Sequence, residues 1–116
     1  MHNFRKLKVW QKAVKLVKPV YKLASKLPVE ENYALTSQIK RACSSISANI
    51  AEGAGRNTDK DFAKFLSIAQ GSCFELESHL IVADTLEFIS EDDLKAMEIN
   101  IIEIEKMLNT MITKFS

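Results

Sequence analysis

The residues that most often carry chemistry are few in this sequence and stand apart from one another. Neither His2 nor His79 belongs to a His-x-x-x-His or Glu-x-x-His pair of the kind that binds metals in helical bundles. His79 suits a surface or interface position better than a ligand role. No Cys-x-x-Cys pair, Gly-rich phosphate loop or oriented general base is present. We therefore expect no metal, no cofactor and no catalysis.

The two cysteines, Cys43 and Cys73, fall on apolar helix faces. A disulfide framework would use more cysteines in a smaller chain, so a reducing compartment fits them better. If their helices are antiparallel, the two thiols lie at a similar height. We expect two buried thiols that are neighbours without being bonded.

A stripe of polar residues is the more informative feature. They recur every three or four positions on a helix that is otherwise almost free of charge, namely Gln38, Arg41, Ser45, Asn49 and Glu52. An antiparallel neighbour would bring Arg41 level with Glu75 and near Glu77, which predicts an Arg–carboxylate pair within one chain or between two copies. The stripe fits a polar seam that gives packing its specificity, or alternatively a ligand or nucleic-acid site.

A second stripe is cationic and lies on the first predicted helix, at Lys8, Lys12, Lys15, Lys22 and Lys26. Met1 to Val29 contains eight Lys or Arg and no acid, whereas Thr58 to Ser116 contains twelve acids. The stripe fits the solvated face of an amphipathic helix, or a surface that contacts phosphates without reading sequence. The asymmetry also fits pairing between neighbouring helices. No aromatic residue interleaves with the lysines, so base stacking is not indicated.

The hydrophobic periodicity predicts that these stripes lie on four helices, and no segment alternates as a strand. The expected ranges are about 7–26, from Glu30 or Glu31 to about 52 with the end at Gly53 and Gly55, 58–87 and 90–114. Thr58 and Ser90 are each followed three residues later by Asp, which predicts capped helix starts. With short connections, these helices should form one domain over residues 1–116, an antiparallel up-down four-helix bundle.

The first two helices have more apolar surface than one bundle can bury. The expected core face of the first helix is Leu7, Trp10, Val14, Val17, Tyr21 and Ala24. A further set widens this arc to over half the circumference, at Val9, Ala13, Leu16, Val20 and Leu23. The second helix adds a face of small residues at Ala34, Ser37, Ser44, Ala48 and Ala51. We therefore expect the chain to bind another copy of itself.

No apolar run approaches the roughly 20 residues of a membrane span, and the Lys-rich N-terminus lacks the features of a secretory signal. We expect a cytoplasmic protein without membrane contact.

Several motifs in this order resemble a known family: Leu27-Pro28-x-Glu30, Gln38-Ile39-x-Arg41-Ala42, Ser45-Ile46-x-x-Asn49-Ile50-Ala51-Glu52-Gly53 and Glu75-x-Glu77. They resemble the bacterial four-helix-bundle family whose founding members are encoded in intervening sequences of 23S ribosomal RNA genes. The resemblance covers essentially the whole chain and implies an up-down bundle that assembles into a ring, a pentamer. It implies no known activity.

A related group, the accessory proteins of diversity-generating retroelements, is similar in fold and forms pentamers that bind a reverse transcriptase and nucleic acid. Those proteins are strongly basic, whereas this chain has a net charge of +1. Two hypotheses about function follow. The chain is either a homo-oligomer associated with RNA through its lysine stripe, or a scaffold whose only partners are proteins.

Overall fold

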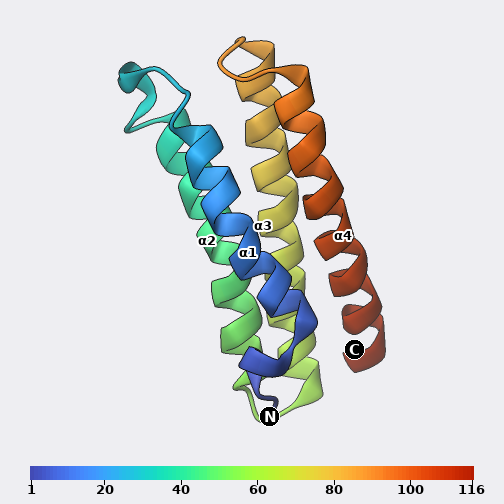
Figure 1. The fold of residues 1–116 in the computed structure, drawn as a ribbon. Coiled ribbons are helices and arrows are strands. Elements are labelled where there is room, and N and C mark those ends of the chain that lie inside the picture. Colours follow the sequence, from blue (N-terminus) through green and yellow to red (C-terminus); the bar gives the residue numbers. More distant parts are fainter.

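The computed structural model describes residues 1–116 as four α-helices with no strand. α1 spans Lys8–Ala24, α2 spans Leu35–Ala54, α3 spans Asp59–Thr85 and α4 spans Glu91–Phe115, and the short 3-10 turns η1 (Phe4–Lys6) and η2 (Val29–Glu31) precede α1 and α2. The helices lie side by side in a bundle of 43 × 24 × 19 Å, with both termini at the same end (Figure 1). α2 packs most extensively on α3, whereas α1 and α4 have the fewest contacts of the neighbouring helix pairs.

The starts of α3 and α4 are where the sequence predicts them. Thr58 Oγ1 accepts a hydrogen bond from the Asp61 N–H at 3.1 Å. Ser90 Oγ accepts one from the Asp93 N–H at 3.0 Å, and the Asp93 carboxylate accepts the Ser90 N–H at 3.3 Å, which completes a capping box. Caps of this kind stabilise a helix by about 1 kcal/mol because they satisfy backbone donors that no intrahelical carbonyl reaches.

The predicted start of α2 at Glu30 or Glu31 is wrong. Those residues belong to the 3-10 turn η2, and α2 begins at Leu35 with no side-chain cap at Ala34. Glutamates suit the positive end of a helix dipole, but packing supplies most helical stability. Val29 and Tyr33 are 71% and 100% exposed, so a helix that began earlier would have had no apolar face to bury.

The end of α2 agrees with the prediction at Gly55, which is the C-cap residue, but Gly53 lies inside the helix and no glycine has a positive φ. A Cβ built on Gly53 would lie 2.6 Å from Phe65 Cβ and 3.0 Å from Phe62 Cδ1. Both phenylalanines belong to α3. Gly53 therefore allows the backbone of α2 to approach α3 closely, rather than serving as a helix stop.

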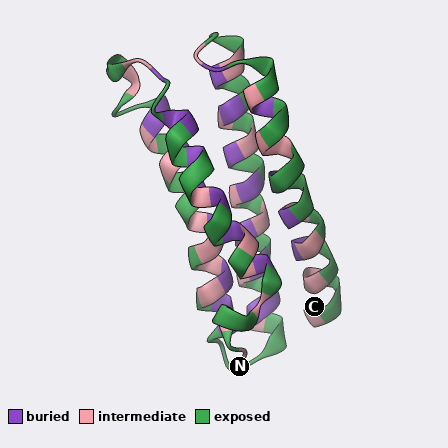
Figure 2. Cartoon of the chain, viewed as in Figure 1, coloured by how far each residue is buried: buried purple, intermediate pink, exposed green.

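The core is one continuous cluster of 26 buried residues that all four helices contribute to. Its largest fully buried side chains include Ile39 and Ile46 of α2, Leu66 and Leu76 of α3 and Ile101 of α4. The buried segments face inward along each helix (Figure 2). No helix has the combination of length and apolar character that a membrane span requires.

α1 buries only part of the core face expected for it. Ala24 of that face is buried, and Leu7, Trp10 and Val17 pack partly against the core. The residues predicted to widen the apolar arc are fully buried, namely Val9, Ala13, Leu16, Val20 and Leu23. Val14 and Tyr21, expected at the centre of the core face, are 41% and 37% exposed. Both sets satisfy the same spacing of three and four, and only the positions of α2 and α4 decide between them.

The N-terminal residues fasten the end of the bundle where both termini lie. The His2 N–H donates to the Ala54 carbonyl at 2.7 Å. The His2 ring lies 4.8 Å from the Phe62 ring and 5.2 Å from the Phe115 ring, measured between centroids. Contacts at these distances join the end of α2, the start of α3 and the end of α4.

The contrast between two glycines tests the close approach of α2 and α3. Gly53→Ala should destabilise the protein by about 1–3 kcal/mol, because the new methyl group overlaps Phe65 and Phe62. Gly71→Ala, at an exposed position of α3 with nothing within 4 Å of the new atom, should stabilise it by about 0.5–1 kcal/mol. Urea unfolding of both variants at one protein concentration measures the difference. Equal effects would contradict a steric role for Gly53.

Candidate binding surfaces

The centre of the predicted polar stripe is a hydrogen-bonded seam between α2 and α3. Ser45 Oγ lies 2.9 Å from Ser72 Oγ of α3. Asn49 Nδ2 donates to the Ser45 carbonyl at 2.8 Å and to Ser45 Oγ at 2.9 Å. These half-buried polar groups satisfy one another, which fits a part in packing. Ser72 is a partner that the stripe on α2 alone did not reveal.

The N-terminal end of the stripe borders a shallow polar hollow of about 350 Å³, which is lined by Gln38, Arg41, Glu75 and His79. The structure thus brings Arg41 and Glu75 to the same place, as the antiparallel register predicts. No ion pair joins them within the chain. Arg41 is exposed, and Glu75 Oε1 lies 3.8 Å from His79 Nε2. At the other end of the stripe, Glu52 pairs with Arg56 at 3.3 Å.

Glu77 does not join this seam, contrary to its predicted place near Arg41. Two residues along a helix are about 200° apart, so Glu75 and Glu77 cannot both face α2. Glu77 faces α4, where it lies within hydrogen-bonding reach of Glu105 and Glu98. The sequence analysis does not identify Glu98 or Glu105. Their spacing of seven residues, on either side of the core residue Ile101, indicates that both lie on one stripe of α4 close to the core.

These three glutamates repel one another where solvent is partly excluded. Loss of solvent and the adjacent Glu105 carboxylate raise the pKa of Glu77 above its usual 4.5. Loss of solvent and the neighbouring Glu77 likewise raise the pKa of Glu98. Glu105 Oε1 is buried without a hydrogen-bond donor. When Glu77 carries a proton, its carboxyl O–H donates to Glu105 and one negative charge is removed from the cluster.

The lysine stripe is divided by contacts with α4. Lys12 Nζ lies 2.7 Å from Glu103 Oε1, and Lys26 Nζ lies 2.9 Å from Asp93 Oδ2. The hydrogen bond from Lys26 lowers the pKa of Asp93, and a bond from the Ser90 N–H adds to the effect. Lys8, Lys15 and Lys22 are exposed and have no acid within ion-pairing distance. The charge asymmetry of the sequence therefore serves helix pairing in part and leaves three free cations in the stripe.

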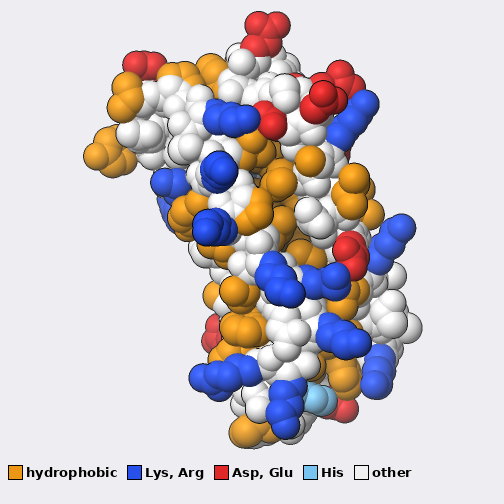
Figure 3. All heavy atoms as spheres, in the orientation of Figure 1, with side chains coloured by type: hydrophobic (Ala, Val, Ile, Leu, Met, Phe, Trp, Pro, Cys, Tyr) orange, Lys and Arg blue, Asp and Glu red, His pale blue; other side chains and the backbone are white.

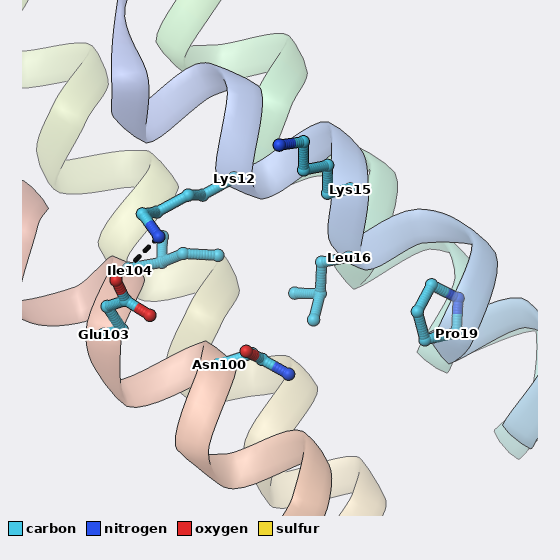
Figure 4. A pocket seen from close by; sticks show the side chains of 7 residues that line it. All are labelled: Lys12, Lys15, Leu16, Pro19, Asn100, Glu103 and Ile104. Atoms are coloured by element: carbon cyan, nitrogen blue, oxygen red, sulfur yellow. Dashed lines mark ion pairs between the residues drawn. The ribbon is translucent and has the colours of Figure 1, made fainter.

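A groove runs between α1 and α4, the pair of neighbouring helices with the fewest contacts. Its first part, about 150 Å³, is lined by Leu16 and Ile104 with Lys15 and Asn100 at its edges (Figure 4). Its second part, about 280 Å³, is lined by Leu23 and Met97 with Lys22 at its edge, and Pro19 borders both parts. Figure 3 shows hydrophobic side chains between the cationic column over α1 and the surface of α4.

Other apolar side chains are exposed on the outer surface of the bundle. α3 contributes Ile68 (52%), Phe74 (54%), Ile81 (43%) and Val82 (42%). Phe74 and Ile81 are seven residues apart and form one apolar stripe of the helix. Ile68 and Val82 are fourteen residues apart, about 100° around the helix from that stripe, on a face that also carries the exposed Glu75 midway between them.

The cysteines are confirmed as free, buried thiols. Burial raises the pKa of Cys43 and of Cys73 to about 12, and the nearby Glu105 adds to the shift at Cys73. Neither is a nucleophilic thiolate at neutral pH. No group of three His, Cys, Asp or Glu side chains has an arrangement that would hold a metal ion.

The profile of the 23S rRNA-intervening sequence protein family matches residues 5–110. The fold is similar to the crystal structure of a protein of unknown function from Bacteroides thetaiotaomicron, described as a member of the S23 ribosomal protein family. That similarity has a TM-score of 0.81 at 28% identity and covers 90% of this chain and 97% of the other. No curated protein matches the sequence.

The glutamate cluster makes stability depend on pH in a predictable direction. A carboxyl group whose pKa is raised on folding binds its proton more tightly in the native state. The free energy of unfolding should therefore fall as pH rises from about 4.5 through the raised pKa values. Glu77→Gln should raise the free energy of unfolding at pH 7 by about 0.5 kcal/mol, with less effect at pH 4. Glu75→Gln, an equal charge change at an exposed position of α3, is the control. Urea unfolding between pH 4 and 7 checks this, and identical profiles for both variants would contradict it.

Proposed function

Because the chain belongs to the 23S rRNA-intervening sequence protein family and exposes apolar side chains that its own core does not cover, we propose that it is a non-catalytic homo-oligomeric binding protein. Its first partner is a second copy of itself. The protomer is an up-down antiparallel four-helix bundle, and the assembly is a closed ring. A pentamer is the ring that the family resemblance implies.

The observation that carries this proposal is the exposure of four large apolar side chains on α3. Exposed apolar side chains gathered on one helix commonly mark a protein interface. A ring needs two different faces on each copy, because every copy contacts one neighbour with each face. The Phe74–Ile81 stripe and the Ile68–Val82 face lie about 100° apart. Two such faces on one helix support a heterologous interface better than a two-fold one.

The small residues of α2 add to this support. Ser44 and Ala48 are exposed on a helix with few charges, and Ala51 is half-buried. Small exposed side chains permit close approach of another backbone at little entropic cost. The lysine pairs to Glu103 and Asp93 reduce the cationic surface that would favour nucleic acid over protein.

Sedimentation velocity and native mass spectrometry of the unmodified chain test self-association. We expect one defined species larger than a monomer, and a pentamer if the resemblance extends to subunit number. Phe74→Lys combined with Ile81→Lys should reduce the mass, since each buried lysine charge would need a partner. Thr110→Lys, at an exposed position on α4 away from α3, is the matched control and should leave the mass unchanged. A native monomer at all concentrations would disprove the proposal.

RNA association is the second candidate, and the free cations of α1 favour it. Lys8, Lys15 and Lys22 have no acidic partner, and no acid occurs in residues 1–29. Clustered cations of this kind contact phosphates without reading sequence, and the affinity then falls steeply with salt. A protein scaffold without RNA would instead retain a defined protein partner in nuclease-treated lysate.

Charge reversal separates these alternatives. Lys8→Glu, Lys15→Glu and Lys22→Glu together should abolish binding to a fluorescent RNA of mixed sequence at low salt. Lys60→Glu, Lys106→Glu and Lys114→Glu make the same charge change at exposed positions elsewhere and should retain most of the affinity. Fluorescence anisotropy across a salt series gives both results. Absence of RNA binding by the native protein at low salt would exclude this candidate and leave the protein scaffold.

A further inference from the structure

The connection between α1 and α2 presents two large apolar side chains to solvent. Tyr33 is fully exposed and Val29 is 71% exposed. Glu30 and Glu31 lie between them, and neither makes an ion pair within the chain. The segment projects at the end of the bundle opposite to the termini (Figure 1). It therefore combines largely exposed apolar side chains with acidic groups that have no ion-pair partner in the same chain.

The groove between α1 and α4 has the complementary character. Its floor is formed by Leu16 and Ile104 in one part and by Leu23 and Met97 in the other. The Lys12–Glu103 and Lys26–Asp93 ion pairs cross it near its two ends. α1 ends at Ala24, so Lys26 lies in the turn that follows it, and the helical side of the groove from Lys12 to Ala24 is about 18 Å long. This length holds a short extended segment or one helical turn with its flanking residues.

The free cations of the groove lie between those two ion pairs. Lys15 and Lys22 line its edges, are exposed and have no acidic partner, whereas the acids on the α4 side, Glu103 and Asp93, are already paired. The groove thus offers an apolar floor and two unneutralised positive charges. An occupant that places apolar side chains on the floor and two carboxylates at the rim would match both features.

We propose that the Val29–Tyr33 segment of one copy docks into the α1–α4 groove of a second copy, with Tyr33 and Val29 on the apolar floor and Glu30 and Glu31 facing Lys15 and Lys22. This contact rests on the proposed self-association and adds a segment-to-groove contact to the one that the exposed α3 side chains make. The segment and the groove are different surfaces, so each copy gives its segment to one neighbour and receives one from the other. Repetition of a contact of this type around a closed cycle generates a ring.

The chemistry of the segment suits an interface anchor. A tyrosine buries about 150–250 Å² and loses little rotamer entropy, and anchors of this type lie in pockets surrounded by polar contacts. The carboxylates of Glu30 and Glu31 would accept hydrogen bonds from Lys15 and Lys22 at the rim, where they direct orientation more than affinity. The same segment is where the predicted α2 helix fails to form, which leaves its side chains free to enter another molecule.

The first test removes the anchor. Tyr33→Ser should weaken self-association by at least about tenfold, measured as the dissociation constant by sedimentation velocity over a dilution series. Tyr33 is fully exposed, so its replacement should leave thermal unfolding measured at a concentration where both proteins are monomeric unchanged. Ile99→Ser, which removes another highly exposed apolar side chain from α4, is the matched control and should retain native association.

The second test exchanges the charges across the contact. Glu30→Lys with Glu31→Lys should weaken association, and Lys15→Glu with Lys22→Glu should weaken it as well. A chain that carries all four substitutions should recover most of the native association, because each lysine again faces a glutamate. An equimolar mixture of the two double variants should recover association in part, since a junction between unlike variants is complementary. A ring of five copies keeps at least one junction between like variants, so recovery should be smaller than in the four-substitution chain.

The outcomes separate this contact from the proposals it builds on. If the native chain assembles but Tyr33→Ser has no effect, or the four-substitution chain is no better than the double variants, the docking contact is wrong and self-association stands. A native monomer overturns both. RNA association requires Lys15 and Lys22 but not Tyr33, so loss of assembly in Tyr33→Ser with intact RNA binding supports the docking contact.

Discussion

The close packing of α2 on α3 is the constraint on which the rest of the molecule depends. Gly53 lets the α2 backbone approach Phe62 and Phe65, and the Ser45–Ser72 contact holds the same two helices farther along. Small residues bring helix axes together and so fix the relative rotation of both helices. The rotation of α3 then determines that Glu75 faces the Arg41 hollow while Glu77 faces α4.

The weak contact between α1 and α4 is the counterpart of that close packing. α1 packs mainly on α2 and α4 packs mainly on α3, so α1 and α4 flank the central α2–α3 pair over a shared core. The Lys12–Glu103 and Lys26–Asp93 ion pairs join this side of the bundle to α4 at its surface, and they do not fill the space between the helices. Exposed ion pairs of this kind contribute at most about 1 kcal/mol each, so they hold α1 and α4 together only weakly. The groove between the two helices therefore stays accessible to a partner.

Local signals were enough to predict much of this fold. Thr58 and Ser90 cap their helices as their sequences indicate, since a cap depends only on residues within one turn. The buried face of α1 and the start of α2 depend on which helices lie nearby, and sequence periodicity does not contain that information. Among the candidate site residues, Gln38, Arg41 and Glu75 were grouped correctly because they share one register. The prediction for Glu77 is wrong, because residues two positions apart on a helix are rotated by about 200°, so Glu77 faces α4 when Glu75 faces α2.

The distribution of charge bears on which of the two proposed partners, a second copy of the chain or RNA, has the larger driving force for binding. A nucleic-acid surface gains affinity from every free cation, yet two of the five lysines in the α1 stripe are committed to α4 within the chain. The exposed apolar side chains of α3 and the Tyr33 side chain have no such internal partner. Burial of exposed apolar surface contributes roughly 25 cal/mol per Å² and is insensitive to screening by salt. Association with another copy therefore has a driving force at physiological ionic strength that the three remaining lysines do not match, and a ring would then present those lysines as a repeated array to any anionic partner.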